Sequence, residues 1–302
     1  MKIRTSLSSV KAIFISLILL FFVFILTSEK VSDQKELAKY RSYTIEYNLK
    51  EISGLTISNK INSLLYAIED SGNGTYVSAI TETGKKAGRI KLKHAKNKDW
   101  EDISIGPGPQ KGLTYLYIAD IGDNYKRRNH LSIYRIKEPD FKTLSINNDL
   151  TAEAEEIKLK YPEGKYDAEA FLTDPANGTI YIATKQVDKS VIFKTKPAAN
   201  VKGIYIMKQV ARIPYGGITA GAISKKRNLL VLKNRDEVFC WKLKRDELPE
   251  KALQSKPVKL PYLKETQGEA ICFDAIGKGY FTTSELRKKG NPELRYYKLP
   301  LF

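Results

Sequence analysis

Five short segments of the chain repeat one arrangement of polar and apolar positions. In each, an apolar residue stands two places after the third position, and a second apolar stretch follows. The segments are Glu51–Leu55, Asp99–Ile103, Asp167–Phe171, Thr219–Ile223 and Gln267–Ile271. Their third positions lie 48, 68, 52 and 48 residues apart. A period of this size is typical of the blades of a β-propeller, in which each unit is one four-stranded sheet.

Further apolar stretches supply the outer strands of each unit. For the first four units we predict outer strands, in chain order, at Thr75–Ile80, Gly88–Lys93, Leu131–Ile136, Glu153–Tyr161, Val191–Thr195, Ile204–Ile213, Glu237–Leu243 and Pro257–Leu260. The fifth unit has only Leu294–Leu299, whereas Tyr43–Leu49 precedes the first unit and has no other partner. Pairing of these two strands would close the ring and remove two exposed edges.

The sequence therefore predicts an all-β fold, a propeller of five four-stranded blades closed by pairing of the N-terminal strand with the last blade. The alternative of six blades would need another blade in the long second unit. There, Phe141–Leu150 is too polar for a blade and is interpreted as a loop. Runs such as Leu229–Leu232 are apolar without alternation, as expected for strands that neighbouring blades bury on both faces.

The first thirty residues have a different character. Lys2, Arg4 and Lys11 precede an uncharged apolar run at 12–26, the arrangement of an export signal. The length of this run fits either the core of a cleaved signal peptide or a short membrane anchor, and both place the body of the protein outside the cytoplasm. We therefore divide the chain into a signal peptide or signal anchor at 1–28, a linker at 29–42 and a propeller domain at 43–302.

The chain is strongly basic, with a formal net charge of +17. Such an excess favours anionic surfaces, for example phospholipid headgroups or an envelope polyanion, although a lysine-rich solvated exterior gives the same number. No zinc-finger, RRM or helix-turn-helix pattern is present, so no specific nucleic-acid partner is predicted. Cys240 and Cys272 fall in different predicted strands of neighbouring blades. An exported chain could pair them, but we favour two buried thiols.

Glutamate occupies the third position of the repeat in three units, at Glu101, Glu169 and Glu269, while Ser53 and Gly221 take the other two. In a propeller the inner strands begin at the mouth of the central channel, so these side chains should converge there. Three converging carboxylates repel one another unless one is protonated or a cation lies among them. Their oxygen atoms suit calcium or magnesium, and we predict a metal site at the three glutamates. The structural alternative is that they accept hydrogen bonds from the amides of neighbouring blades.

The loops that follow the second strands share this face of the ring. The most distinctive runs from Asp120 through Gly122 to Asn124 and is followed by Arg127 and Arg128. It is interpreted either as a tight turn whose side chains bond their own backbone, or as an acidic wall with arginines that hold an anionic ligand. The predicted ligand-binding residues are Asp99, Asp120, Asp123, Asn124, Arg127, Arg128, Asp167, Lys185, Lys233 and Glu285. Arg287, Lys288 and Lys289 extend the basic rim.

Several of these motifs carry a resemblance. As a set, 99–107, 117–124, 134–139, 167–170 and 267–271 resemble an uncharacterised family of secreted bacterial β-propellers over roughly residues 95–300. More distantly, the acidic openings of the inner strands are similar to those of phytase-like esterase, gluconolactonase and calcium-activated nucleotidase propellers. That likeness implies a central cation at Glu101, Glu169 and Glu269. Ser53 and Gly221 depart from a fully acidic ring.

Three classes of function follow from these patterns. The first is a non-enzymatic extracytoplasmic protein that binds a ligand, with or without calcium or magnesium, at the channel mouth. The second is a metal-dependent hydrolase of a phosphoester, lactone or glycoside that uses the axial carboxylates. The third is a structural envelope protein. His94 and His130 are the only imidazoles, and no nucleophile elbow or phosphate-binding loop is present, so no catalytic residue is predicted.

Overall fold

The structure is a computed structural model that describes residues 40–141, 149–286 and 290–300. The predicted export segment at 1–28, most of the predicted linker, and Arg287, Lys288 and Lys289 lie outside these residues. Within the described part, no helix is long and apolar enough to cross a membrane. The helix α2 (Pro249–Ala252) is a single turn between two strands of the fourth blade.

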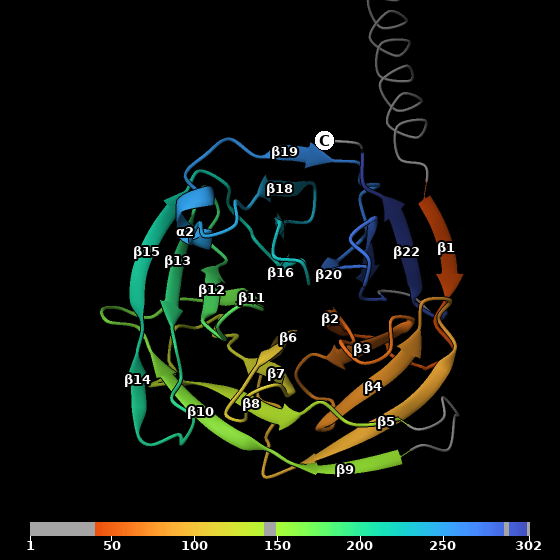
Figure 1. Cartoon of the computed structure of the whole chain (residues 1–302), viewed down its shortest axis with the longest axis horizontal. Coiled ribbons are helices and arrows are strands. Elements are labelled where there is room, and N and C mark those ends of the chain that lie inside the picture. Colours follow the sequence, from red (N-terminus) through yellow and green to blue (C-terminus); the bar gives the residue numbers. More distant parts are fainter. Residues whose placement is uncertain (1–39, 142–148, 287–289, 301–302) are drawn as a thin grey trace, which may run out of the picture. The chain divides into compact units, whose positions relative to one another are not determined.

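Five sheets stand around a central axis, as Figure 1 shows. The inner strand of each sheet begins at one segment of the sequence repeat: β2 (Ile52–Ile57), β6 (Trp100–Pro107), β11 (Ala168–Thr173), β16 (Ala220–Ile223) and β20 (Gly268–Phe273). Each inner strand contacts the next around the ring, and β20 contacts β2. The prediction of a five-bladed propeller is therefore confirmed.

Each blade continues outward from its inner strand by antiparallel pairing. The second strands are β3 (Leu64–Glu69), β7 (Thr114–Asp120), β12 (Ile180–Thr184), β17 (Leu229–Lys233) and β21 (Gly279–Ser284). The third strands are β4 (Tyr76–Thr81), β8 (Leu131–Lys137), β13 (Ser190–Thr195), β18 (Val238–Lys242) and β22 (Glu293–Lys298). The fourth strands of blades 1 to 4 are β5 (Lys86–Lys93), β10 (Glu155–Lys160), β15 (Lys208–Ile213) and β19 (Val258–Leu260).

The fifth blade takes its outer strand from the start of the domain. Strand β1 (Tyr40–Thr44) pairs antiparallel with β22, with Ser42 opposite Arg295. The predicted closure is thus confirmed, but the pairing strand begins and ends earlier than the predicted Tyr43–Leu49. Ile45 leaves the sheet to donate its amide to the carbonyl of Pro292, and Ile45 and Leu49 are buried in the core between blades 5 and 1.

Two predicted outer strands are each divided between neighbouring blades. Strand β9 (Asp149–Glu153) adds a fifth, parallel strand to blade 1, and after Ala154 the chain continues as β10 in blade 2. In the same way β14 (Ile204–Ile206) joins blade 2, and after Met207 the chain continues as β15 in blade 3. The interpretation of 141–150 as a loop is therefore wrong for its last two residues. Both crossings keep their hydrogen bonds, because the Ala154 and Met207 amides donate to carbonyls of the blade being left.

Candidate functional site at the channel mouth

The third positions of the repeat have equivalent places in the ring. Each is the second residue of its inner strand. In four blades it is the extra residue of a β-bulge, since its two neighbours pair with consecutive residues of the second strand. A bulge leaves one residue outside the ladder and redirects its side chain. Blade 4 has Gly221 here and pairs without a bulge. The side chains of the three glutamates and of Ser53 therefore leave their inner strands through the same local backbone arrangement.

The three glutamates differ in their partners. Glu169 forms an ion pair with Lys185, which follows the second strand of its own blade. Glu269 accepts a hydrogen bond of 2.6 Å from Arg235 of blade 4. Glu101 is only 6% exposed, and within the described part of the chain its carboxylate has neither a hydrogen bond nor an ion pair. Among the described residues, Glu101 is therefore the one of the three glutamates without a direct ion pair, and the charge of Lys185, which is paired with Glu169, attracts it only from a greater distance.

Two aspartates surround Glu101. Asp70 directly follows β3 of blade 1, and Asp99 directly precedes β6 of blade 2. One carboxylate oxygen from each of Asp70, Asp99 and Glu101 lies within 4.8 Å of the other two. Such a set can surround a hard cation, for which carboxylate oxygens are the preferred ligands. The predicted set of Glu101, Glu169 and Glu269 stays a prediction. Within the described residues, the set with ligand atoms this close shares only Glu101 with it.

The pKa values in this cluster reflect crowded negative charge. Burial, followed by the charges of Asp70 and Asp99, raises the pKa of Glu101 well above its usual value. Burial and the neighbouring Asp70 raise the pKa of Asp99 to about 6. Burial also raises the pKa of Asp70, and the charges of Glu269 and Glu51 add to this shift, while a hydrogen bond between the two aspartate side chains opposes it and raises the pKa of Asp99. The cluster therefore concentrates negative charge that either a proton or a cation would relieve.

The loop after β7 closes one side of this cluster. A side chain at Gly122 would place its Cβ 2.2 Å from Oε1 of Glu101 and 2.3 Å from Oδ2 of Asp99, so any other residue would displace both carboxylates. Buried Asp120 accepts hydrogen bonds from the Asp99 amide (3.1 Å) and from Nη1 of Arg128 (2.7 Å). The loop therefore fixes the backbone of one candidate ligand and packs against the carboxylates of two.

The second half of the same loop is held by Asp123. Its carboxylate accepts hydrogen bonds from the amides of Arg127 (2.7 Å) and Arg128 (2.9 Å), as the interpretation of a tight turn predicts. Its own amide donates to Asp167 of blade 3 at 2.9 Å. Asn124 and Arg127 are exposed, and the Arg127 guanidinium lies 5.2 Å from the Tyr125 ring centroid.

A second pair of acidic side chains lies on blade 5. Burial and the neighbouring Glu269 raise the pKa of Glu285 to about 8, and its carboxyl is hydrogen-bonded to that of Glu269. The side-chain amide of Gln267 also donates to Glu285. The charge of Asp70 contributes to the shift of Glu285, so the two acidic groups belong to one electrostatic site.

Lys233 is placed differently from its prediction as a ligand-binding residue. Its side chain is fully buried between blades 4 and 5, where Nζ donates to the carbonyl of Gly268. The ammonium lies 4.8 Å from the ring centroid of Tyr262. Burial lowers the pKa of Lys233 to about 8, against the opposing attraction of Glu265 and Glu269. Lys233 therefore joins two blades behind the mouth.

Asp102 is a central residue that the sequence patterns did not single out. It is fully buried, and its carboxylate accepts hydrogen bonds from the amides of Ile103 (2.8 Å), Phe171 (3.0 Å) and Gly221 (3.4 Å). These amides belong to blades 2, 3 and 4. Asp102 thus performs the bracing that was the structural alternative for the glutamates. The corresponding position of blade 1 is Gly54, where a Cβ would lie 2.8 Å from the Cα of Asp102.

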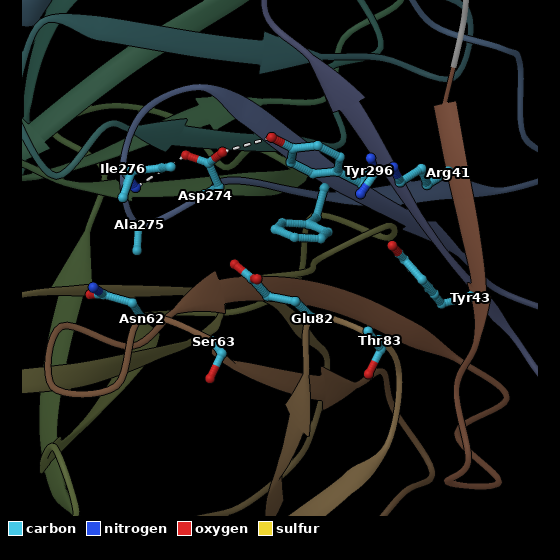
Figure 2. Close-up of a pocket in the computed structure, with 11 residues that line it drawn as sticks. Arg41, Tyr43, Asn62, Ser63, Glu82, Thr83, Asp274, Ala275, Ile276 and Tyr296 are labelled. Atoms are coloured by element: carbon cyan, nitrogen blue, oxygen red, sulfur yellow. Dashed lines mark hydrogen bonds between the residues drawn. The ribbon is translucent and has the colours of Figure 1, made fainter.

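A cavity of about 510 Å³ lies at the opposite strand ends, where blade 5 meets blade 1 (Figure 2). Its walls include Arg41 and Tyr43 of β1, Glu82 after β4, and Asp274 after β20. The hydroxyl of Tyr296 donates to Asp274 at 2.9 Å. Asp274 also accepts two backbone amides, so its carboxylate is well satisfied. This cavity is therefore separate from the acidic cluster at the mouth.

Comparisons with known proteins assign neither a family nor a function to the chain. No protein-family model and no curated protein matches the chain. A chain in the crystal structure of a nidogen/laminin complex is 13% identical, with a TM-score of 0.46 over 77% of this chain and 72% of that one. The Dos1 propeller is 10% identical, with a TM-score of 0.38 over 82% and 68%. The five-bladed architecture therefore rests on the structure itself, and the resemblance to secreted bacterial propellers stays a prediction.

Proposed function

We propose that this propeller binds a divalent cation, calcium or magnesium, at the mouth of its channel through Asp70, Asp99 and Glu101, and that the cation holds a ligand there. The observation that carries the proposal is the buried carboxylate of Glu101. It has no direct ion pair among the described residues, and its oxygen lies within 4.8 Å of oxygens from two aspartates. A buried carboxylate in such company is either protonated or neutralised by a cation.

The charges around the mouth also suggest how a ligand would lie. Carboxyl groups dominate blades 5, 1 and 2, where Glu285, Asp70 and Glu101 stand. Lys185 of blade 3 and Arg235 of blade 4 stand on the other side, each engaged by one glutamate. A ligand whose anionic group binds the cation would extend toward Lys185 and Arg235. We therefore favour a small anionic ligand, such as one bearing phosphate, sulfate or carboxylate groups.

The test compares metal responses of matched glutamate variants in the purified full-length protein. After treatment with a chelator, calcium or magnesium should raise the melting temperature of the wild type. A free metal concentration a hundredfold above Kd would raise the free energy of unfolding by about 2.7 kcal/mol. Glu101→Gln should lose this response, because a neutral amide keeps the shape of the side chain and removes its charge. It should be no less stable than the wild type in chelator, since it also removes a buried, unpaired charge.

Glu169→Gln is the matched control, because Glu169 has the same place in its strand but is paired with Lys185. It should keep the metal response while losing stability in all conditions. If Glu169→Gln abolished the response as fully as Glu101→Gln, the cation would belong to the three equivalent glutamates instead. A wild type that ignores calcium, magnesium and chelator alike would refute the proposal of a metal.

A second candidate function is a metal-dependent hydrolase, favoured by the state of Glu285. A carboxyl with a pKa near 8 is protonated at neutral pH and can donate a proton to a leaving group. Activity on a phosphoester, lactone or glycoside that requires both the cation and Glu285 would establish this function. Binding that is unchanged in Glu285→Gln, without turnover in either protein, would leave the binding function alone.

The setting of the proposed function depends on the apolar segment at 12–26. If that segment exports or anchors the chain, the propeller works outside the cytoplasm, and its ligand is a component of that space. The envelope-protein alternative predicts binding that follows overall charge and disappears with salt. Ligand binding that survives 0.5 M salt and requires Glu101 would exclude that alternative.

A further inference from the structure

A small cavity of about 140 Å³ lies beside the mouth on blade 2, between the β7–β8 loop and the chain that follows β10. Arg128 and His130 contribute from the loop, and Lys160, Tyr161 and Lys165 contribute from the facing segment. At roughly 30 Å³ for each water molecule, the space corresponds to a few waters or one tetrahedral oxyanion. It is distinct from the carboxylate cluster, with which it shares only the loop.

Two side chains of this cavity carry buried donors without partners. Arg128 is 14% exposed, and Nη1 donates to Asp120 and to the carbonyl of Gly122. Its Nε and Nη2 are buried and have no hydrogen-bond partner among the described residues. The hydroxyl of Tyr161, a residue that is 5% exposed, also lacks a partner there. Buried donors of this kind are rare in folded proteins and indicate a bound molecule.

The free donors have a specific geometry. Nε and Nη2 form one edge of the planar guanidinium, the edge that grips two oxygens of a carboxylate, phosphate or sulfate in parallel. The nearby carboxylates are already occupied, because Asp120 accepts the other side of Arg128 and Asp123 accepts two backbone amides. The fork of Arg128 is therefore available for an acceptor from outside the chain.

Basic side chains outnumber acidic ones in the lining: Arg128, Lys160 and Lys165 stand against Asp123, whose charge, like that of Asp167, acts on the Tyr161 hydroxyl. Lys160 and Lys165 line the cavity, and Lys165 Nζ donates to the carbonyl of Arg127 at 2.9 Å. Burial lowers the pKa of His130, and the charges of Lys158, Lys98 and Arg128 lower it further against the attraction of Glu156. A water molecule would satisfy the donors but leave this excess of positive charge. An anion would satisfy both.

We propose that this cavity is a binding site for a tetrahedral oxyanion, phosphate or sulfate, held by the Nε–Nη2 edge of Arg128 and the hydroxyl of Tyr161. The anion is either free or the terminal group of a larger molecule, and Lys160 and His130 lie at its border. The site does not rest on the proposed cation, because none of Asp70, Asp99 and Glu101 lines it.

The experiment measures binding of inorganic phosphate to the full-length protein by thermal melting and by NMR of the histidines. The chain has only two histidines, so Asn or Gln variants assign each imidazole signal. Phosphate should raise the melting temperature more than chloride at equal ionic strength. It should also raise the pKa of His130, because a bound anion offsets the positive neighbours, and should leave His94 unchanged. Methyl phosphate and sulfate in place of phosphate show whether an esterified or a fully deprotonated group is accepted.

Tyr161→Phe tests the role of the Tyr161 hydroxyl, which has no hydrogen-bond partner among the described residues. In phosphate-free buffer this variant should melt no lower than the wild type, because the hydroxyl that it removes has no partner there. Its affinity for phosphate should fall about tenfold, as is typical for the loss of one hydrogen bond to a charged group. Arg128→Lys, which keeps the charge but loses the fork, should weaken phosphate further. Tyr125→Phe, at a strongly exposed tyrosine of the same loop, is the control and should leave the affinity unchanged.

Two results would overturn the proposal. One is a wild type in which phosphate moves neither the melting temperature beyond the chloride control nor the His130 signals. The other is Tyr161→Phe with the phosphate affinity of the wild type. Glu101→Gln separates this site from the proposed metal site, since it should lose the response to calcium or magnesium and keep the response to phosphate.

Discussion

Replacement of Lys233 by methionine tests whether this lysine belongs to the ligand site or to the contact between blades 4 and 5. Its ammonium is fully buried, donates to the carbonyl of Gly268 and lies over the ring of Tyr262. Methionine has a similar length and keeps the packing without the charge. The neighbouring Glu265 keeps hydrogen bonds from Tyr262 (3.1 Å) and Thr282 (2.6 Å), so the replacement does not leave its carboxylate without partners.

The magnitude follows from the lowered pKa of Lys233. Burial lowers it from 10.5 to about 8. At about 1.4 kcal/mol for each pKa unit, protonation of this lysine costs the folded state about 3 kcal/mol at neutral pH. Because the folded pKa is the lower one, the stability given by the neutral amine is fully present above 10.5 and is lost as pH falls to about 8. Below pH 8 the cost is constant.

The assay is the melting temperature of wild type and Lys233→Met at intervals between pH 7 and pH 10.5. Relative to the variant, the wild type should gain up to about 3 kcal/mol over this range, which is roughly 6–12 °C for a domain of this size. Lys256→Met, at an exposed lysine, is the control for titration elsewhere and should follow the wild type. A difference between wild type and Lys233→Met that stays flat up to pH 10.5 would show that the ammonium is not buried as described.

Two further predictions concern the mouth and the closure of the ring. Folding raises the pKa values of Asp99 and Glu285, so each carboxyl favours the folded state only while it is protonated. Without divalent cations, the melting temperature should therefore fall as pH rises from about 5 to about 8. Saturating calcium or magnesium should reduce this fall and bind more tightly at pH 8 than at pH 6, which melting curves at both pH values measure. Deletion of residues 30–50 should abolish cooperative unfolding, because it removes β1 and buried Ile45 and exposes the edge of β22. A deletion of residues 30–39 is the control. Of the two deletion variants, only this one should show a cooperative melt by circular dichroism.

The propeller was predictable because its signal repeats. Each inner strand opens with the same short pattern, and three of them are buried along their whole length, so five weak matches reinforce one another. The closure followed from counting strands. The divided outer strands were not predictable, because a strand that passes from one blade to the next has the same apolar pattern as a continuous one. Only the burial of Met207 between blades 2 and 3 marks where the second crossing occurs.

The face that carries the candidate site could be predicted from the sequence, whereas the side chains that cluster there could be predicted only in part. The repeat identifies Glu101, and the loops after the second strands point to the same face. The sequence does not reveal that Lys185 and Arg235 neutralise the other two glutamates, since these contacts depend on loop conformations. Asp70 is in the expected loop, but nothing in its neighbourhood distinguishes it from other loop aspartates. A carboxylate immediately after a second strand, facing an acidic inner-strand opening in the next blade, is the signal that could have identified it.

The mouth is asymmetric because residues at equivalent backbone positions have different side-chain partners. A repeat gives five residues equivalent backbone positions, but it does not give them equivalent neighbours. Blade 4 has neither the glutamate nor the bulge at this position, and it contributes buried Lys233 and partly exposed Arg235. Blades 1 and 2 bring three acidic side chains together, and the bases that act on them, Arg128 and Lys185, are ion-paired with Asp120 and Glu169. A symmetric ring of five acids would place a cation on the axis, whereas this ring concentrates negative charge at one seam, so a cation bound as proposed there would leave the rest of the mouth open for a ligand to reach it from the side.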